Sequence, residues 1–86
     1  MYTILVAVMF MQLRIRDLRE DRDLTQADMA AFLGCRQQTY SRYENEQAQP
    51  SLETLARLAA YFGTSVDYLL GITDEPRPYP PAKRRR

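Results

Sequence analysis

The sequence predicts a compact all-α domain of five short helices, and three observations support this prediction. Apolar residues recur every three or four positions through most of the 86-residue chain, as in helices that bury one face. Residues that cap helix starts precede the apolar stretches at Thr25 and Ser51, and glycines follow them at Gly34 and Gly63. A chain of this length builds one core, so we expect no second catalytic or ligand-sensing domain.

An apolar, β-prone segment, residues 1–10 (MYTILVAVMF), precedes the first helix. It is too short to cross a bilayer, which takes about 20 apolar residues, and it lacks the basic start and cleavage site of a signal peptide. Three interpretations stay open: a strand that pairs with a second copy or covers a groove, a continuation of the first helix, or a true translation start at Met9 or Met11. We favour the strand, because apolar strands are rarely left exposed.

The first helix is expected from about Met11 to Asp21. Ile15, Leu18 and the aliphatic stem of Arg19 recur at helical spacing on one of its faces. This face is therefore expected to pack against the rest of the domain.

The second helix is expected over Gln26–Leu33. Thr25 is its N-cap, because the threonine hydroxyl can accept a hydrogen bond from an otherwise unpaired amide of the first turn. Gly34 is expected to end the helix in the left-handed conformation, which glycine adopts without steric cost. The buried stripe of this helix is expected to consist of Met29, Ala30 and Leu33.

A third, short helix is expected from about Arg36 to Asn45, with two unlike faces. Tyr40 and Tyr43 point to the apolar side, whereas the polar side chains fall within about 140° of one another. These are Gln37, Gln38, Ser41, Arg42 and Asn45. Glutamine and arginine read adenine and guanine in the major groove of DNA. Any surface helix shows polar residues to water, but a capped helix, a glycine turn and an acid-free face together favour DNA recognition.

The fourth helix is expected to begin after the capping residue Ser51 and to end at Gly63. Its helically spaced apolar residues are Leu52, Leu55, Ala56, Ala59 and Phe62. Thr64 and Asp67 match a capping box for a fifth, short helix. The apolar residues of that helix are Val66, Leu69 and Leu70.

A proline-rich tail, residues 74–86, follows the expected domain of residues 11–73 and is expected to be flexible. It ends in KRRR, which is a solubilising run or, alternatively, an arm that adds phosphate contacts. The domain carries seven arginines against nine acidic residues, a net −2, and the tail carries +3. A domain that is not generally basic argues against nucleic-acid binding, although a local basic patch is sufficient at physiological salt.

The sequence provides no chemistry for an enzyme or a metal site. It has no histidine and one cysteine, so neither a Cys/His metal site nor an intrachain disulfide is expected. Cys35 is expected to be a semi-buried thiol and not a redox site. Glycine-rich phosphate loops and serine nucleophile motifs are absent as well. We expect no catalytic residue and no cofactor.

Most of the chain resembles the lambdoid phage repressor and Cro family of helix-turn-helix (XRE-type) regulators. The resemblance is carried, in family order, by IRDLRE, LTQADMA, LG, TYSRYEN, PSLETLARLA and FGTSVDYLLG between residues 15 and 71. It implies a five-helix repressor-like fold and a sequence-specific DNA-binding transcriptional regulator, more commonly a repressor. The alternative is an antitoxin-like module that holds a protein partner.

The resemblance also implies a homodimer that places two recognition helices in successive major grooves, about 34 Å apart on double-stranded DNA. The base-reading residues are then Arg36, Gln37, Gln38, Ser41 and Arg42. The phosphate contacts are then Gln26, Thr39 and Asn45. Such a protein is expected to be encoded by a bacterium or a phage and to lie in the bacterial cytoplasm, associated with the nucleoid. We expect it not to bind a membrane.

Three further expectations come from the family pattern. Arg19 and Glu44 match an ion pair between the first and third helices; the alternative is two unrelated surface charges. The family usually has glycine where this chain has Glu46, so we expect Asn45 to take the left-handed conformation instead. The last helix often makes the dimer contact, which indicates Tyr68 and Leu69, with core packing the alternative for Leu69.

Overall fold

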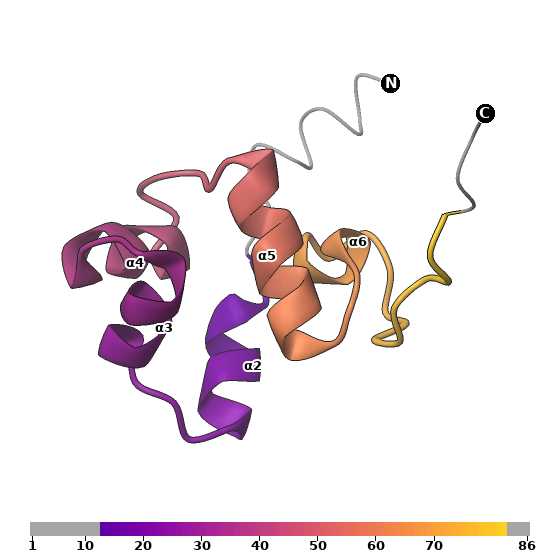
Figure 1. Ribbon diagram of the computed structural model, residues 1–86, viewed down its shortest axis with the longest axis horizontal. Coiled ribbons are helices and arrows are strands. Elements are labelled where there is room, and N and C mark those ends of the chain that lie inside the picture. Colours follow the sequence, from indigo (N-terminus) through magenta and orange to yellow (C-terminus); the bar gives the residue numbers. More distant parts are fainter. Residues whose placement is uncertain (1–12, 83–86) are drawn as a thin grey trace.

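The computed structural model describes residues 13–82, in which five α-helices are present (Figure 1). The helices are α2 (Ile15–Asp21), α3 (Gln26–Leu33), α4 (Gln37–Glu44), α5 (Leu52–Phe62) and α6 (Val66–Leu69). In Figure 1, α3 and α4 form one end of the molecule, α5 crosses its middle, and α6 lies on the other side of α5. The predicted all-α class is confirmed. The expectations for residues 1–10 and for the KRRR run lie outside the described residues.

The first helix starts later than predicted within the described part of the chain. Leu13 and Arg14 precede α2, which begins at Ile15. The Arg14 amide donates a hydrogen bond to the Leu69 carbonyl at 3.0 Å. The start of the described chain is therefore tied to α6, near the other end of the domain.

Each helix in residues 13–82 ends with the same backbone motif. One residue takes the left-handed conformation, its amide bonds the carbonyl three residues back, and the next amide bonds the carbonyl five residues back. The left-handed residues have φ between 56° and 77° and are Asp23, Gly34, Glu46, Gly63 and Gly71. The predicted helix ends at Gly34 and Gly63 are confirmed.

The end of α4 differs from the prediction by one residue. Glu46 takes the left-handed conformation with φ of 62°, whereas φ is −95° at Asn45. Asn45 stays close to helical geometry because its amide still donates to the Ser41 carbonyl at 3.0 Å. The chain therefore reverses one residue later, at a residue whose Cβ makes this conformation less favourable than it is for glycine.

Side-chain caps set the starts of three helices. Thr25 caps α3 in a box with Asp28: the Thr25 hydroxyl accepts from the Asp28 amide at 3.0 Å, and the Asp28 carboxylate accepts from the Thr25 amide at 2.9 Å. Ser51 caps α5 as predicted. The predicted box of Thr64 with Asp67 is wrong, because Ser65 caps α6 by accepting from the Tyr68 amide at 3.0 Å. Thr64 is instead buried in the turn that closes α5.

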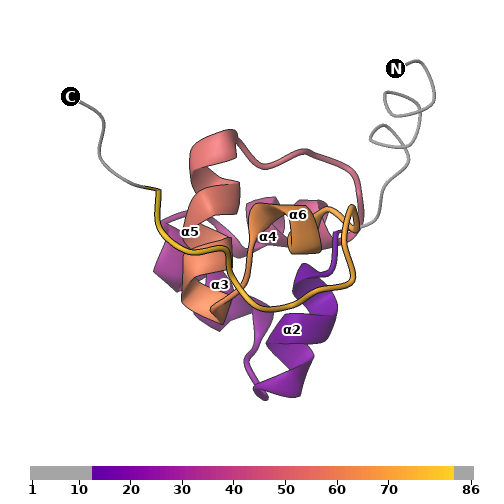
Figure 2. The ribbon, with the colours of Figure 1, turned by 90° about the vertical axis from the view of Figure 1, so that its right-hand side faces the viewer.

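All five helices contribute to one hydrophobic core, and α5 contributes the most residues. The buried apolar residues are Ile15, Met29, Ala30, Tyr40, Leu55, Leu58, Ala59, Phe62 and Leu69. The α5 prediction is wrong for Leu52, which is 83% exposed, and for Ala56, which is also exposed. The first turn of α5 extends beyond the neighbouring helices in Figures 1 and 2. Leu58, absent from the prediction, is fully buried.

The described part of the tail contacts the helical domain at two places. The Arg14 guanidinium donates to the Thr73 carbonyl at 3.0 Å and to the Asp74 carboxylate at 2.7 Å. Further along the tail, the Tyr79 hydroxyl donates to the Asp67 carboxylate at 2.7 Å. Figure 2 shows this segment passing in front of α5 and α6 without forming a helix.

Candidate nucleic-acid interface

The candidate interface is built on α3 and α4, which pack against each other across the turn at Gly34. The inner face of α4 is anchored by two aromatic rings. Tyr40 is fully buried, and its ring meets that of Tyr43 edge to face, with 6.4 Å between the ring centroids. This packing fixes the rotation of α4 about its axis and so decides which side chains face outward.

The outer face of α4 carries the side chains that were predicted to read bases. Arg36, Gln37, Gln38 and Arg42 are exposed, and Ser41 is half-buried. Among the hydrogen bonds of residues 13–82, none involves the side chain of Arg36, Gln37, Gln38 or Arg42. These amide and guanidinium groups can therefore bind another molecule without breaking a hydrogen bond within the described chain.

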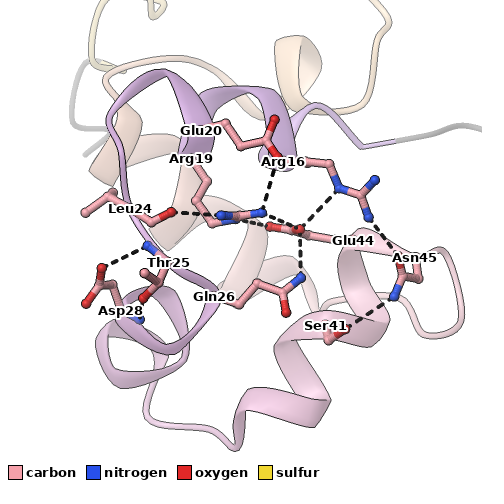
Figure 3. Close-up of polar contacts among 10 residues, drawn as sticks. All are labelled: Arg16, Arg19, Glu20, Leu24, Thr25, Gln26, Asp28, Ser41, Glu44 and Asn45. Atoms are coloured by element: carbon pink, nitrogen blue, oxygen red, sulfur yellow. Dashed lines mark hydrogen bonds and ion pairs between the residues drawn. The ribbon is translucent and has the colours of Figure 1, made fainter.

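Glu44 lies on α4 but turns away from this face, as Figure 3 shows. Its side chain is fully buried. The Arg19 guanidinium reaches both carboxylate oxygens, from Nε at 2.6 Å and from Nη2 at 3.1 Å. The Gln26 amide donates at 3.0 Å, and Arg16 Nε donates at 3.4 Å. One buried acid thus joins α2, α3 and α4.

The electrostatics of this cluster keep Glu44 ionised. Burial by itself raises the pKa of Glu44, but the hydrogen bonds and the positive charge supplied by Arg19, with the Gln26 amide, more than offset it and lower the pKa to about 2. The same ion pair raises the pKa of Arg19. Because the carboxylate charge is paired inside the domain, α4 presents no acidic side chain to an approaching ligand.

Comparison with known proteins agrees with this geometry. A family model described as helix-turn-helix matches residues 15–69, which include all five helices. The chain belongs to this family. Within this family, the sequence resembles the regulators of the phage repressor and Cro type. No solved structure matches the chain.

Several curated helix-turn-helix proteins are similar to this chain. The uncharacterized HTH-type transcriptional regulator YobD of Bacillus subtilis is 42% identical over 65 residues, which cover 76% of this chain and 58% of YobD. The cryptic phage CTXphi transcriptional repressor RstR of Vibrio cholerae is 40% identical over 57 residues, 66% of this chain and 51% of RstR. The HTH-type transcriptional regulator AnsR of B. subtilis is 41% identical over 58 residues, 67% and 50% of the two chains. The chain spans about half the length of these relatives.

Within this helix-turn-helix unit, the residues predicted to contact phosphate have different surroundings. Gln26 is half-buried and uses one N–H group on Glu44. Thr39 is half-buried on α4, and Asn45 is exposed at the end of that helix. Asn45 bridges two side chains, accepting from Arg16 at 2.7 Å and donating to the Ser41 hydroxyl at 3.3 Å.

The sequence analysis missed the part that Arg16 plays in this helix-turn-helix unit. Arg16 and Arg19 are three residues apart in α2, a spacing that places two side chains on the same face of a helix. That spacing is the signal that identifies Arg16 as a second neighbour of Glu44. The contact of Arg16 with Asn45 carries no such signal, because it joins residues 29 positions apart.

Three other features of the described residues bear on function. Residues 13–82 contain no group of three or more His, Cys, Asp or Glu side chains that could hold a metal ion. Cys35 is a half-buried free thiol at the turn before α4. None of the helices α2 to α6 is both long and apolar enough to cross a bilayer.

Proposed function

We propose that this protein is a sequence-specific DNA-binding transcriptional regulator, in most settings a repressor, that acts in the bacterial cytoplasm. The observation that carries the proposal is the outer face of α4, which presents free amide and guanidinium groups while the acid of that helix is paired inside the domain. Regulators and a phage repressor among the similar proteins support this function.

In this proposal, α4 enters the major groove. Arg36, Gln37, Gln38 and Arg42 meet base edges, where an arginine pairs with guanine and a glutamine with adenine. Ser41 reads a neighbouring base as a single hydroxyl. Gln26, Thr39 and Asn45 lie at the margins of the helix pair and bind phosphates, which fixes the register of the protein on the duplex.

The active form is a homodimer in which two copies of α4 occupy successive major grooves, about 34 Å apart. Of the two candidates for the dimer contact, Leu69 is fully buried in the core of its own chain, so the contact falls to the half-buried Tyr68 and to exposed residues near α6. Ile72, which is 56% exposed directly after that helix, is an apolar residue of this kind.

Selection from a pool of random duplexes, followed by sequencing, tests the proposal. The full chain is used at low and at moderate salt, because phosphate contacts alone weaken steeply as salt rises. An enriched motif of two inverted half-sites at both salt concentrations is expected. Unselective binding that disappears at moderate salt contradicts base reading. The antitoxin-like alternative then becomes the better account, and a second protein that co-purifies with the chain would support it.

A further inference from the structure

A chain of hydrogen bonds runs from α2 to the outer face of α4 (Figure 3). Arg16 Nη2 donates to Asn45 Oδ1 at 2.7 Å, and Asn45 Nδ2 donates to the Ser41 hydroxyl oxygen at 3.3 Å. Arg16 Nε also lies 3.4 Å from Glu44, so two points on the guanidinium hold it in one orientation. Arg16 thus reaches a predicted base-reading residue without touching it.

The direction of these hydrogen bonds follows from the chemistry of the first donor. A guanidinium has N–H groups and no acceptor, so the Asn45 atom that faces it must be the amide oxygen. The amide nitrogen of Asn45 then faces the opposite way, toward Ser41. The Ser41 oxygen accepts from it, which leaves the hydroxyl hydrogen for another acceptor. Among the hydrogen bonds of residues 13–82, the Ser41 hydroxyl donates none.

We propose that Arg16 is a positioning residue that makes Ser41 a hydrogen-bond donor toward DNA. This inference rests on the proposed function. A hydroxyl that can donate and accept is ordinarily compatible with either kind of base edge. Held by Asn45, Ser41 favours the acceptors of the major groove, which are purine N7, guanine O6 and thymine O4. It disfavours cytosine at the contacted base, because the N4 amino group that cytosine presents in the major groove is a donor.

Without Arg16, the Asn45 amide is free to rotate and present its oxygen to Ser41. The Ser41 hydroxyl would then donate to Asn45 and face the groove as an acceptor. The preference for an acceptor at one base pair would be lost, while the rest of α4 would read its bases as before. The structure therefore predicts a change in specificity at one position of each half-site.

The experiment is selection from random duplexes with the full chain and four variants: Arg16→Ala, Arg16→Lys, Ser41→Ala and Arg77→Ala. Arg16→Ala and Ser41→Ala should lose discrimination at the same base pair by about 5-fold, the effect of one hydrogen bond. Arg16→Lys supplies another group that only donates, so the preference should return. Arg77→Ala removes an exposed tail arginine and controls for the lost charge.

A second measurement uses the free protein and needs no DNA. The side-chain amide of Asn45 should have a high NMR order parameter in the unmodified chain and in Arg16→Lys, and a lower one in Arg16→Ala. An order parameter unaffected by Arg16→Ala overturns the proposal, because the arginine then does not hold the amide.

The DNA results separate this inference from the proposed function. If the unmodified chain selects a motif and Arg16→Ala weakens binding equally for all sequences, Arg16 is a phosphate contact and only this inference fails. The same holds if Ser41→Ala leaves the motif unchanged, since the hydroxyl then turns back onto its own helix. If the unmodified chain selects no motif, the proposed function fails and takes this inference with it.

Discussion

Replacing Glu44 by glutamine tests the buried cluster that keeps the acid of α4 off the outer face of that helix. The substitution preserves the shape of the side chain and removes its charge. In the folded protein the pKa of Glu44 is lowered from 4.5 to about 2. A difference of this size corresponds to about 3 kcal/mol at neutral pH. The glutamine side chain can still accept a hydrogen bond from Arg19, so we expect Glu44→Gln to cost less than this, about 2 kcal/mol.

The lowered pKa of Glu44 also determines how the stability of the fold changes with pH. A carboxyl group whose pKa is lower in the folded state stabilises the fold fully above its unfolded pKa, and this contribution disappears as the pH falls to the folded value. The unmodified chain should therefore exceed Glu44→Gln in free energy of unfolding at pH 7. The difference should shrink between about pH 4.5 and pH 2 and vanish near pH 2. Stability rises with pH across this window.

Urea denaturation followed by far-UV circular dichroism measures both effects. Arg19→Ala should cost more than Glu44→Gln, on the order of 3–5 kcal/mol, because it leaves the carboxylate charge buried without its main partner. Arg77→Ala is the matched control, since its guanidinium pairs with Glu75 at the surface and its loss should leave the unfolding curve unchanged. A difference between the unmodified chain and Glu44→Gln that stays constant from pH 7 to pH 2 would refute this reasoning.

Substitutions at three other positions test the helix ends and caps by the same urea assay. Glu46→Gly should stabilise the domain by about 1 kcal/mol, because glycine fits the left-handed conformation, whereas Glu46→Ala should give no such gain. Ser65→Ala should cost about 1 kcal/mol, since it removes the N-cap of α6. Thr64→Val should be neutral or stabilising by up to about 1 kcal/mol, because the buried Thr64 hydroxyl has no hydrogen bond among the described residues. A loss for Thr64→Val larger than for Ser65→Ala would contradict the placement of the cap.

Much of the fold could be predicted because its signals are local. The N-cap at Thr25 and the glycine at position 34 are each within one residue of α3, and the structure places that helix at Gln26–Leu33 as predicted. The same kind of signal gives α5 its bounds. Helical periodicity also separated the two faces of α4, since Tyr40 is buried and Gln37 and Gln38 are exposed.

The errors concern positions where the local signal permits two registers. Thr64 and Ser65 can both cap a helix, and the closing turn of α5 decides between them by burying the first. Asn45 and Glu46 can both end α4. The hydrogen bond from the Asn45 amide to the Ser41 carbonyl keeps Asn45 near helical geometry, so Glu46 takes the left-handed conformation. Leu52 fits the apolar periodicity of α5, but the packing of the described helices leaves it exposed.

The polar contacts between helices could be predicted only in part. The family pattern predicted the ion pair of Arg19 with Glu44, in which Arg19 Nε lies 2.6 Å from a carboxylate oxygen of Glu44. Gln26 joins the same carboxylate because α3 packs against α4, which no spacing along the chain discloses. The bridge through Asn45 to Ser41 depends on the packing of α2 against α4 as well.

The central claim, that α4 reads base edges, is tested most directly by the affinity of Gln37→Ala and Gln38→Ala for two duplexes. One duplex carries the motif selected by the unmodified chain, and the other is a random sequence of the same length. Both variants should bind the selected duplex more weakly, by about 10-fold or more, and bind the random duplex as the unmodified chain does. Equal losses on both duplexes would place these glutamines on phosphates, and no loss on either would remove α4 from the interface.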